Sequence, residues 1–325
     1  MPDEKRRRVV IASLLGAIGA ALTRSSSGAT RNFTIALVLK GLPDAYTQTM
    51  IAAAKVFQAH APYPFTLLVQ GVTAETDSDG QIRLIDALIA QRVNAIVIAP
   101  ADSRALVPAA RRSVQQRILT LAIDNPLDAD ALSAAGIRVP YVGPDDRRAA
   151  RLVGDYLAHR LRPGDRVGII EGVHSARNAQ QRNAGYRDAM QAAHVEIVAI
   201  APGDWEYGKG RLAAAAMLAA HPGMRALLCA NDNMARGAVD AVRAAQLSGH
   251  VLITGFNDDD AIKPLIKKGQ VLATLDQFAA KQAVYGLDVA MQAHVEQQTQ
   301  DDLSDFIETP VVLITKDNLQ AGHAP

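Results

Sequence analysis

Short apolar runs alternate with longer amphipathic segments along most of this chain. The apolar runs predict strands at 33–39, 65–70, 95–99, 118–123, 139–142, 167–170, 196–200, 226–230, 251–256 and 271–275. The amphipathic segments predict helices at 45–60, 77–91, 103–116, 145–162, 179–193, 207–220, 232–245, 259–268 and 278–296. Strands that alternate with helices indicate βαβ units, and continuous apolar strands indicate parallel sheets buried on both faces.

The alternation is interrupted once, after Leu132, by the segment SAAGIRVPYVGPDD, in which glycine and proline recur. A new strand and helix series begins at Val167. We therefore predict an α/β protein of two similar halves, each a doubly wound (Rossmann-like) lobe. The C-terminal segment FIETPVVLI is extended in character, and we expect it to run between both halves as part of a hinge.

Five of the apolar runs stop on polar residues. They end at Lys40, at Asp124-Asn125, at Asn231-Asp232, at Asn257-Asp258 and at Asp276-Gln277. Open α/β sheets bind ligands beyond the carboxyl ends of their strands, so these side chains should line one site. Amides and carboxylates suit hydroxyl groups, and we predict a site that holds a polar small molecule and releases it unchanged.

The first 29 residues have the pattern of a signal peptide. A basic cluster, Lys5-Arg6-Arg7-Arg8, precedes an apolar run at 9–22, which is too short to span a bilayer. The small residues Ser27-Gly28-Ala29 follow, and we place cleavage after Ala29 and the mature protein in the periplasm. A twin-arginine signal at Arg6-Arg7-Arg8 and a retained N-terminal anchor are the alternatives.

Charge and cysteine content narrow the classes of partner. The first 29 residues hold five of the 34 basic and two of the 33 acidic residues, so the mature chain has a net charge of −2. Such a balance gives no field that would attract nucleic acid, and we expect no nucleic-acid partner. Cys229, the one cysteine, lies in an apolar run and is interpreted as a core residue.

Motifs that carry common chemistries are absent from the sequence. No GxGxxG follows a strand, and GxxxxGK[ST], GxSxG and HExxH do not occur. The eight histidines are scattered without the paired spacing of a zinc site. We therefore expect no enzyme activity, no cofactor and no metal.

Four segments resemble a known family. They are ARNAQQRNAGYRDAM at 176–190, AHPGMRALLCANDNMARGAV at 220–239, ITGFNDDD at 253–260 and VLATLDQ at 271–277. With the strand end at Asp124, they make the chain similar to the periplasmic sugar-binding proteins of ABC importers, in particular the ribose-binding branch. The similarity covers nearly all of the chain after the signal peptide, and NDNMARGA is also typical of effector domains of the lac repressor type.

The resemblance implies the periplasmic binding protein type I fold, with two lobes joined by a three-strand hinge. On this basis we place the N-terminal lobe at 30–143 and 278–309, and the C-terminal lobe at 144–277 and 310–325. The family also implies a monomer that clamps a sugar between its lobes and delivers it to the membrane permease of an ABC importer.

Site residues carry over from the family by position. The resemblance implies ligand contacts from Asp44, Tyr46, Asp124, Asn125, Arg182, Trp205, Asn231, Asn257 and Gln277. Tyr46 and Trp205 would cover the apolar faces of a sugar ring, and the polar residues would bind its hydroxyl groups.

Four positions depart from the ribose-binding pattern. Lys40 replaces a small polar residue, Thr47 replaces an aromatic residue, Asn125 replaces an arginine, and Asn257 replaces an aspartate. We therefore predict a neutral pentose, hexose or related polyol, with ribose as one candidate. His174 is interpreted as a surface residue rather than a ligand contact.

Other functions remain as alternatives. A periplasmic ligand-sensing subunit of a receptor kinase or chemoreceptor would use the same pocket. A repressor would need an N-terminal helix-turn-helix, and the signal segment stands in its place. An enzyme on a doubly wound fold would need a catalytic pair, and neither Asp124 nor Asp276 has a second member nearby in the sequence.

Overall fold

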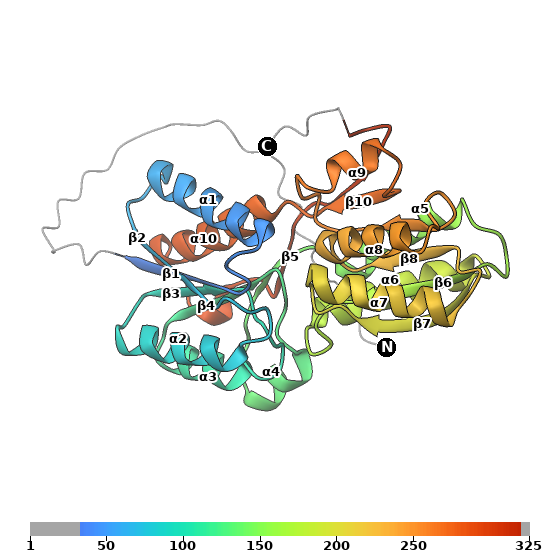
Figure 1. The fold of residues 1–325 in the computed structure, drawn as a ribbon. Coiled ribbons are helices and arrows are strands. Elements are labelled where there is room, and N and C mark those ends of the chain that lie inside the picture. The colour runs from blue at the N-terminus through green and yellow to red at the C-terminus, as the bar shows by residue number, and fades with distance from the viewer. Residues whose placement is uncertain (1–32, 320–325) are drawn as a thin grey trace, which may run out of the picture.

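The computed structural model describes residues 33–319 and contains two α/β lobes that lie side by side (Figure 1). The predicted signal peptide, residues 1–29, lies outside the described residues. Each lobe is built on one six-stranded sheet with helices on both faces. The predicted fold class is confirmed.

The sheet of the first lobe is entirely parallel and has the order β11-β5-β4-β3-β1-β2. Its strands are β1 (Thr34–Leu39), β2 (Thr66–Gly71), β3 (Ala95–Ile98), β4 (Leu119–Ile123), β5 (Tyr141–Gly143) and β11 (Phe306–Glu308). Helices α1 (Ala45–His60) and α10 (Ala279–Val295) cover one face, and α2 (Ser78–Ala90) and α3 (Val107–Gln115) cover the other. Helix α4 (Ala129–Ala135) completes this lobe.

The sheet of the second lobe has the equivalent order β12-β10-β9-β8-β6-β7. Its strands are β6 (Arg166–Glu171), β7 (Glu196–Pro202), β8 (Ala226–Cys229), β9 (Leu252–Thr254), β10 (Ala273–Asp276) and β12 (Val312–Thr315), and only β12 is antiparallel. Its helices are α5 (Asp146–Ala158), α6 (Arg177–Ala192), α7 (Tyr207–Ala220), α8 (Asp232–Ala244) and the short α9 (Lys263–Lys267). Cys229 is fully buried in the core of this lobe, as predicted.

The strand order alone indicates where a ligand site should lie in each lobe. In both lobes the chain starts in an inner strand, β1 or β6, and then winds first to one side and later to the other. The winding direction therefore reverses between β1 and β3 and between β6 and β8. Doubly wound sheets bind ligands at this switch point, beyond the carboxyl ends of the strands.

The described chain passes between the two sheets three times. It leaves β5 for α5, returns from β10 to α10, and crosses again from β11 to β12. Figure 1 shows the return clearly, because the red α10 lies beside the blue α1 in the first lobe. Near the crossings, Arg148 of α5 forms an ion pair with Glu308 of β11. The lobes are therefore joined by three connections, as expected for the predicted three-strand hinge, rather than by a single tether.

The predicted strands all form, but helix α4 was not predicted, α3 and α9 begin four residues later than predicted, and α5 ends four residues earlier. Helix α4 was missed because it is short and was read as part of the break after Leu132. Its end signals were present, since Asp128 caps Ala131 and Gly136 adopts φ +66° after the last turn. Helix α9 begins at Lys263 rather than at 259, because Pro264 has no backbone N–H and fits only in the first turn of a helix.

Helices α5 and α6 approach so closely that only glycine fits at one crossing point. A Cβ atom on Gly185 would lie 2.2 Å from the carbonyl oxygen of Arg147 and 2.9 Å from the Cβ atom of Ala150. We expect Gly185→Ala to lower the free energy of unfolding by about 1–3 kcal/mol, because the helices would have to separate. Urea unfolding of the purified variant measures this change.

Gly208 in α7 is a matched control, because a Cβ atom there would meet nothing within 4 Å. Gly208→Ala should leave the protein as stable or raise its stability by up to about 1 kcal/mol, since alanine favours helix. Equal effects of the two substitutions would contradict the close approach of α5 and α6.

Candidate functional site

The carboxyl ends of the strands in both lobes meet around one cavity. It has a volume of about 40 Å³, well below the range for small-molecule sites, so a ligand of that class enters only when the groups around the cavity move apart. Its lining residues are Leu39, Lys40, Asp44, Tyr46, Thr47, Met50, Glu75, Ala99, Asp124, Asn178, Arg182, Trp205, Asn231, Asn257 and Gln277. All of the predicted ligand residues except Asn125 are therefore brought together here.

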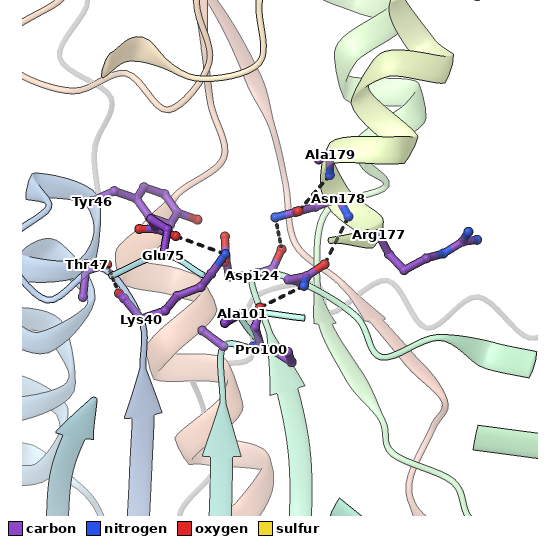
Figure 2. Close-up of polar contacts among 12 residues, drawn as sticks. Lys40, Tyr46, Thr47, Glu75, Pro100, Ala101, Asp124, Arg177, Asn178 and Ala179 are labelled. Carbon is purple, nitrogen blue, oxygen red and sulfur yellow. Dashed lines mark hydrogen bonds and ion pairs between the residues drawn. The ribbon is translucent and has the colours of Figure 1, made fainter. Parts of the chain in front are cut away.

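A buried cation lies between two carboxylates on the first-lobe side of the cavity. The Lys40 Nζ atom lies 3.4 Å from Glu75 Oε2 and 3.4 Å from Asp124 Oδ2, and Lys40 is only 5% exposed. Figure 2 shows the Lys40 side chain reaching from the end of β1 between these two residues. Burial alone would lower the pKa of Lys40, but the charges of Asp124 and Glu75 outweigh it and raise that pKa. Lys40 thus stays charged at the edge of the cavity.

Asp124 is held in place by its backbone. It follows β4 with φ +62°, a left-handed conformation, and its N–H donates to Gln282 Oε1 at 3.1 Å. The Asp124 carbonyl oxygen accepts bonds from Tyr141 Oη at 3.3 Å and from Asn178 Nδ2 at 3.2 Å. The carboxylate is therefore directed at Lys40 by a backbone that neighbouring elements hold from several sides.

The start of α1 places Asp44 and Tyr46 at the cavity. Asp44 caps the helix by accepting from the N–H of Tyr46 at 2.9 Å, and its other carboxylate oxygen accepts from Asn233 of the second lobe. The Tyr46 hydroxyl accepts from Gln282 Nε2 at 3.0 Å. Burial raises the pKa of Tyr46 well above its usual value, so the ring remains neutral and can cover an apolar surface.

Arg182 is the fixed cation of the second lobe. Its Nε donates to Asp146 Oδ1 at 2.7 Å, and its terminal nitrogens donate to the Ala230 carbonyl at 2.9 Å and to Gln277 Oε1 at 3.2 Å. The guanidinium also lies 3.8 Å from the ring centroid of Phe256. Burial opposes the charge, but Asp146 outweighs it and raises the pKa of Arg182. The terminal nitrogens keep further N–H groups for a ligand.

The remaining second-lobe residues are positioned by one another. Asn231 caps α8 by accepting from Met234 N at 2.9 Å and donates to the Trp205 carbonyl at 3.0 Å. Trp205 has φ +68°, so its ring is presented by a backbone that few side chains adopt. Gln277 donates to Asn257 Oδ1 at 2.7 Å.

Asn125 does not line the cavity. Its side chain is fully buried, donates to the Pro100 carbonyl at 2.9 Å, and accepts from the backbone N–H of Asn178 at 3.1 Å. The left-handed turn at Asp124 directs the next side chain away from the ligand space.

Some cavity residues were not predicted as ligand contacts. Lys40 was predicted to line the site as a strand end but not as a ligand contact. Glu75 and Asn178 gave no strand-end signal, because Glu75 lies in the loop after β2 and Asn178 lies in the first turn of α6. Gln282 was also missed, although a fully buried glutamine bonded to Tyr46 and Gln277 connects the two lobes through the hinge. His174 is exposed, and its Nδ1 lies 3.3 Å from Glu171 Oε1, in keeping with its interpretation as a surface residue.

A larger open hollow lies at the opposite edge of the first sheet. It surrounds Phe33, Asn94 and His294, at the amino ends of the strands, and only the first lobe contributes to it. This hollow does not lie at the switch point of the sheet, and the second lobe contributes no residue to it. The cavity between the lobes is therefore the better candidate site.

No His, Cys, Asp and Glu side chains in residues 33–319 form a group that could hold a metal ion. Within the same residues, no helix combines the length and the apolar character that a membrane crossing requires.

Two buried carboxylates lie behind Asn257. Asp232 accepts from Thr274 Oγ1 at 2.7 Å and from the backbone N–H of Asp259 at 2.9 Å. Burial raises the pKa of both Asp232 and Asp259 above their usual values, and their mutual repulsion raises that of Asp259 further. The loop that carries Asn257 therefore lies next to a pair of carboxyl groups, Asp232 and Asp259, that favours holding at least one proton.

The chain has clear relatives among known proteins. Residues 35–298 match the family described as periplasmic binding protein domain. The chain is 50% identical over 281 residues to the D-ribose/D-allose-binding protein of Pseudomonas aeruginosa, covering 86% of this chain and 88% of that protein. It is 30% identical over 223 residues to the D-allose-binding periplasmic protein of Escherichia coli, covering 68% and 72%.

Two solved structures are also similar. An ABC transporter solute-binding protein from Burkholderia multivorans has a TM-score of 0.85 and 49% identity, covering 87% of this chain and 99% of that one. A periplasmic solute-binding protein of an ABC transporter from Actinobacillus succinogenes, with bound D-allose, has a TM-score of 0.82 and 29% identity, covering 89% and 99%.

The carboxylate pair predicts a pH dependence. The pKa of Asp259 is raised above the unfolded value of 3.8, so its contribution to stability is fully present below that value. It is lost as the pH rises through the raised pKa of the folded protein. Asp259→Asn should therefore become more stable relative to the natural protein as the pH increases, measured by urea unfolding at about pH 5 and about pH 8.

Asp260→Asn is the matched control, since the neighbouring Asp260 side chain is 99% exposed. Its stability difference from the natural protein should change little between the two pH values. The interpretation fails if Asp259→Asn and Asp260→Asn show the same pH dependence.

Proposed function

Because this chain belongs to the periplasmic binding protein family, we propose that it is the solute-binding protein of an ABC importer and captures one neutral sugar between its lobes. The observation that carries this proposal is the cavity where the strand ends of both lobes converge. Its polar groups are buried and mutually oriented, and two aromatic residues, Tyr46 and Trp205, stand among them. A sugar ring has the matching surface, with apolar faces and a rim of hydroxyl groups.

D-allose is the first candidate ligand, and D-ribose is the second. The relative from P. aeruginosa is named for both sugars, and the A. succinogenes structure contains D-allose. In this chain we assign hydroxyl contacts to Asp44, Asp124, Arg182, Asn231, Asn257 and Gln277, and we add Lys40, Glu75 and Asn178. We do not assign a ligand contact to Asn125, because its side chain does not line the cavity.

The energetics of the site fit this role. A hydrogen bond to a charged partner contributes roughly 1.5–3 kcal/mol, and micromolar binding needs about 8 kcal/mol. A few bonds to Lys40, Asp124 and Arg182, together with burial of the ring faces, reach that value. These side chains are already held by the protein, so little conformational entropy is lost when a ligand arrives.

Binding would be coupled to closure of the hinge. A ligand that contacts both lobes binds the closed form more tightly and shifts the equilibrium toward it. We propose that the closed monomer then docks on a membrane permease and releases the sugar unchanged. We also retain residues 1–29 as the signal peptide, with lobes at 30–143 and 278–309 and at 144–277 and 310–325. The named relatives favour transport over a sensing role.

The single tryptophan of the chain gives a direct binding assay. Trp205 lines the cavity, so its fluorescence should change when a sugar fills the space next to it. We expect D-allose to bind the purified mature protein with a dissociation constant near the micromolar range, with D-ribose as the comparison. Absence of a response, by fluorescence and by calorimetry, to every pentose, hexose and polyol in a panel would refute sugar binding.

Substitution of the first-lobe carboxylate tests the assigned contacts. Asp124→Asn keeps the shape of the side chain, and asparagine tolerates the left-handed backbone at this position. Loss of a charged bond to the sugar should weaken D-allose binding roughly 10- to 150-fold. His174→Ala, on the surface beside the second-lobe strand ends, should leave the affinity unchanged. Equal affinity losses would contradict the role of Asp124.

A further inference from the structure

Helix α6 of the second lobe begins without a cap of its own. Its N-cap residue is Ala176, which has no side chain to accept a hydrogen bond from the first turn. Helices α1, α2, α4, α5 and α8 are capped by their own residues Asp44, Asp77, Asp128, Asp145 and Asn231. The first backbone N–H groups of a helix have no partner within the helix, and α6 must satisfy them differently.

The missing cap is supplied by the first lobe. The backbone N–H of Arg177 donates to Ser103 Oγ at 2.9 Å, and the N–H of Asn178 donates to Asn125 Oδ1 at 3.1 Å. The third N–H, that of Ala179, is satisfied within the second lobe by Asn178 Oδ1 at 2.8 Å. Figure 2 shows this first turn of α6 facing the loop of Pro100 and Ala101 in the first lobe.

Hydrogen bonding fixes the orientation of both capping side chains. Asn125 Nδ2 donates to the Pro100 carbonyl at 2.9 Å, which assigns the other amide atom as the oxygen that faces α6. The Ser103 hydroxyl donates to the same oxygen at 3.3 Å and can thus accept from Arg177. Ser103 and Asn125 are both fully buried, so the cap is formed out of water.

The cap is continuous with the ligand cavity. Asn178 donates through its side chain to the carbonyl oxygen of Asp124 at 3.2 Å, and both residues line the cavity. The backbone N–H of Ser103 also donates to the Ser175 carbonyl at 3.3 Å. A movement that separates the lobes at this point would break these bonds together and release the backbone of Asp124.

We propose that Ser103 and Asn125 are positioning residues for closure, which cap α6 from the opposite lobe only when the lobes are closed. This inference rests on the proposed function as a hinged sugar-binding protein. In the open form water would replace the cap, so the bonds contribute to the closed form alone. The cap therefore slows release of the sugar without contacting it.

Ser103→Ala tests the cap, because it removes the acceptor of the Arg177 N–H and adds no bulk. We expect D-allose to bind about fivefold to tenfold more weakly, which is the usual effect of losing a cap. The weaker binding should come from a faster dissociation rate. The melting temperature of the ligand-free protein should stay unchanged, because the cap is not formed in the open state. The melting temperature with saturating D-allose should fall.

Ser113→Ala is the matched control. Ser113 is also fully buried in the first lobe, and its hydroxyl lies 2.8 Å from Thr120 Oγ1 within the same lobe. This substitution should lower the melting temperature with and without sugar and leave the affinity unchanged. If Ser103→Ala behaves like Ser113→Ala, its bonds are structural bonds that persist in the open form, and the proposal is overturned.

A ligand-free measurement separates this proposal from the proposed function. Amide hydrogen exchange at Arg177 and Asn178 should be the same in natural protein and Ser103→Ala without sugar. Faster exchange in the variant would show a permanent cap and overturn the proposal. If the natural protein binds no sugar of the panel, the proposed function fails, and this exchange measurement still decides whether Ser103 caps α6 in the absence of ligand.

Discussion

A lysine and an arginine are held almost entirely out of water at the junction of the two lobes, and each depends on carboxylates to remain charged there. Taking such groups from water is costly unless geometry and hydrogen bonding compensate. Lys40 lies between Glu75 and Asp124, and Arg182 is bound by Asp146. Once these pairs exist, the positions of the strand ends around them are tightly constrained. The cavity is therefore lined by polar groups that other groups of the protein hold in place.

Polar groups held in this way can recognise one class of solute. Arg182 is anchored by Asp146, the Ala230 carbonyl and Gln277, which leaves its outer N–H groups in fixed directions. Fixed donors and acceptors reward a ligand whose hydroxyl groups match them and penalise one that leaves a buried group without a partner. Differences in affinity among sugars would follow from the pattern of their hydroxyl groups.

The same polar groups join recognition to movement. Gln282 in α10 donates to Tyr46 and to Gln277, and so connects the first-lobe aromatic to the second-lobe network through a crossing of the hinge. The carbonyl oxygen of Asp124 also accepts a hydrogen bond from the side chain of Asn178 in α6. A ligand held by Asp124 and Arg182 would thus stabilise the contacts that keep the lobes together. Recognition and closure are two consequences of one interlocked set of bonds.

The sequence by itself determined the two doubly wound lobes, the strands and the cavity residues at strand ends, because apolar periodicity and the polar ends of strands are local signals. The other predicted cavity residues, Asp44, Tyr46, Arg182 and Trp205, came only from the resemblance to a known family. The structure differs from the sequence-based predictions where a residue forms a hydrogen bond or ion pair with a residue far away in the chain. Asn125 accepts from α6 instead of lining the cavity, and Glu75 lines the cavity as the second carboxylate that pairs with Lys40. Only the tertiary structure could decide these roles, since the hydrogen bonds and ion pairs that fix them join residues far apart in the chain.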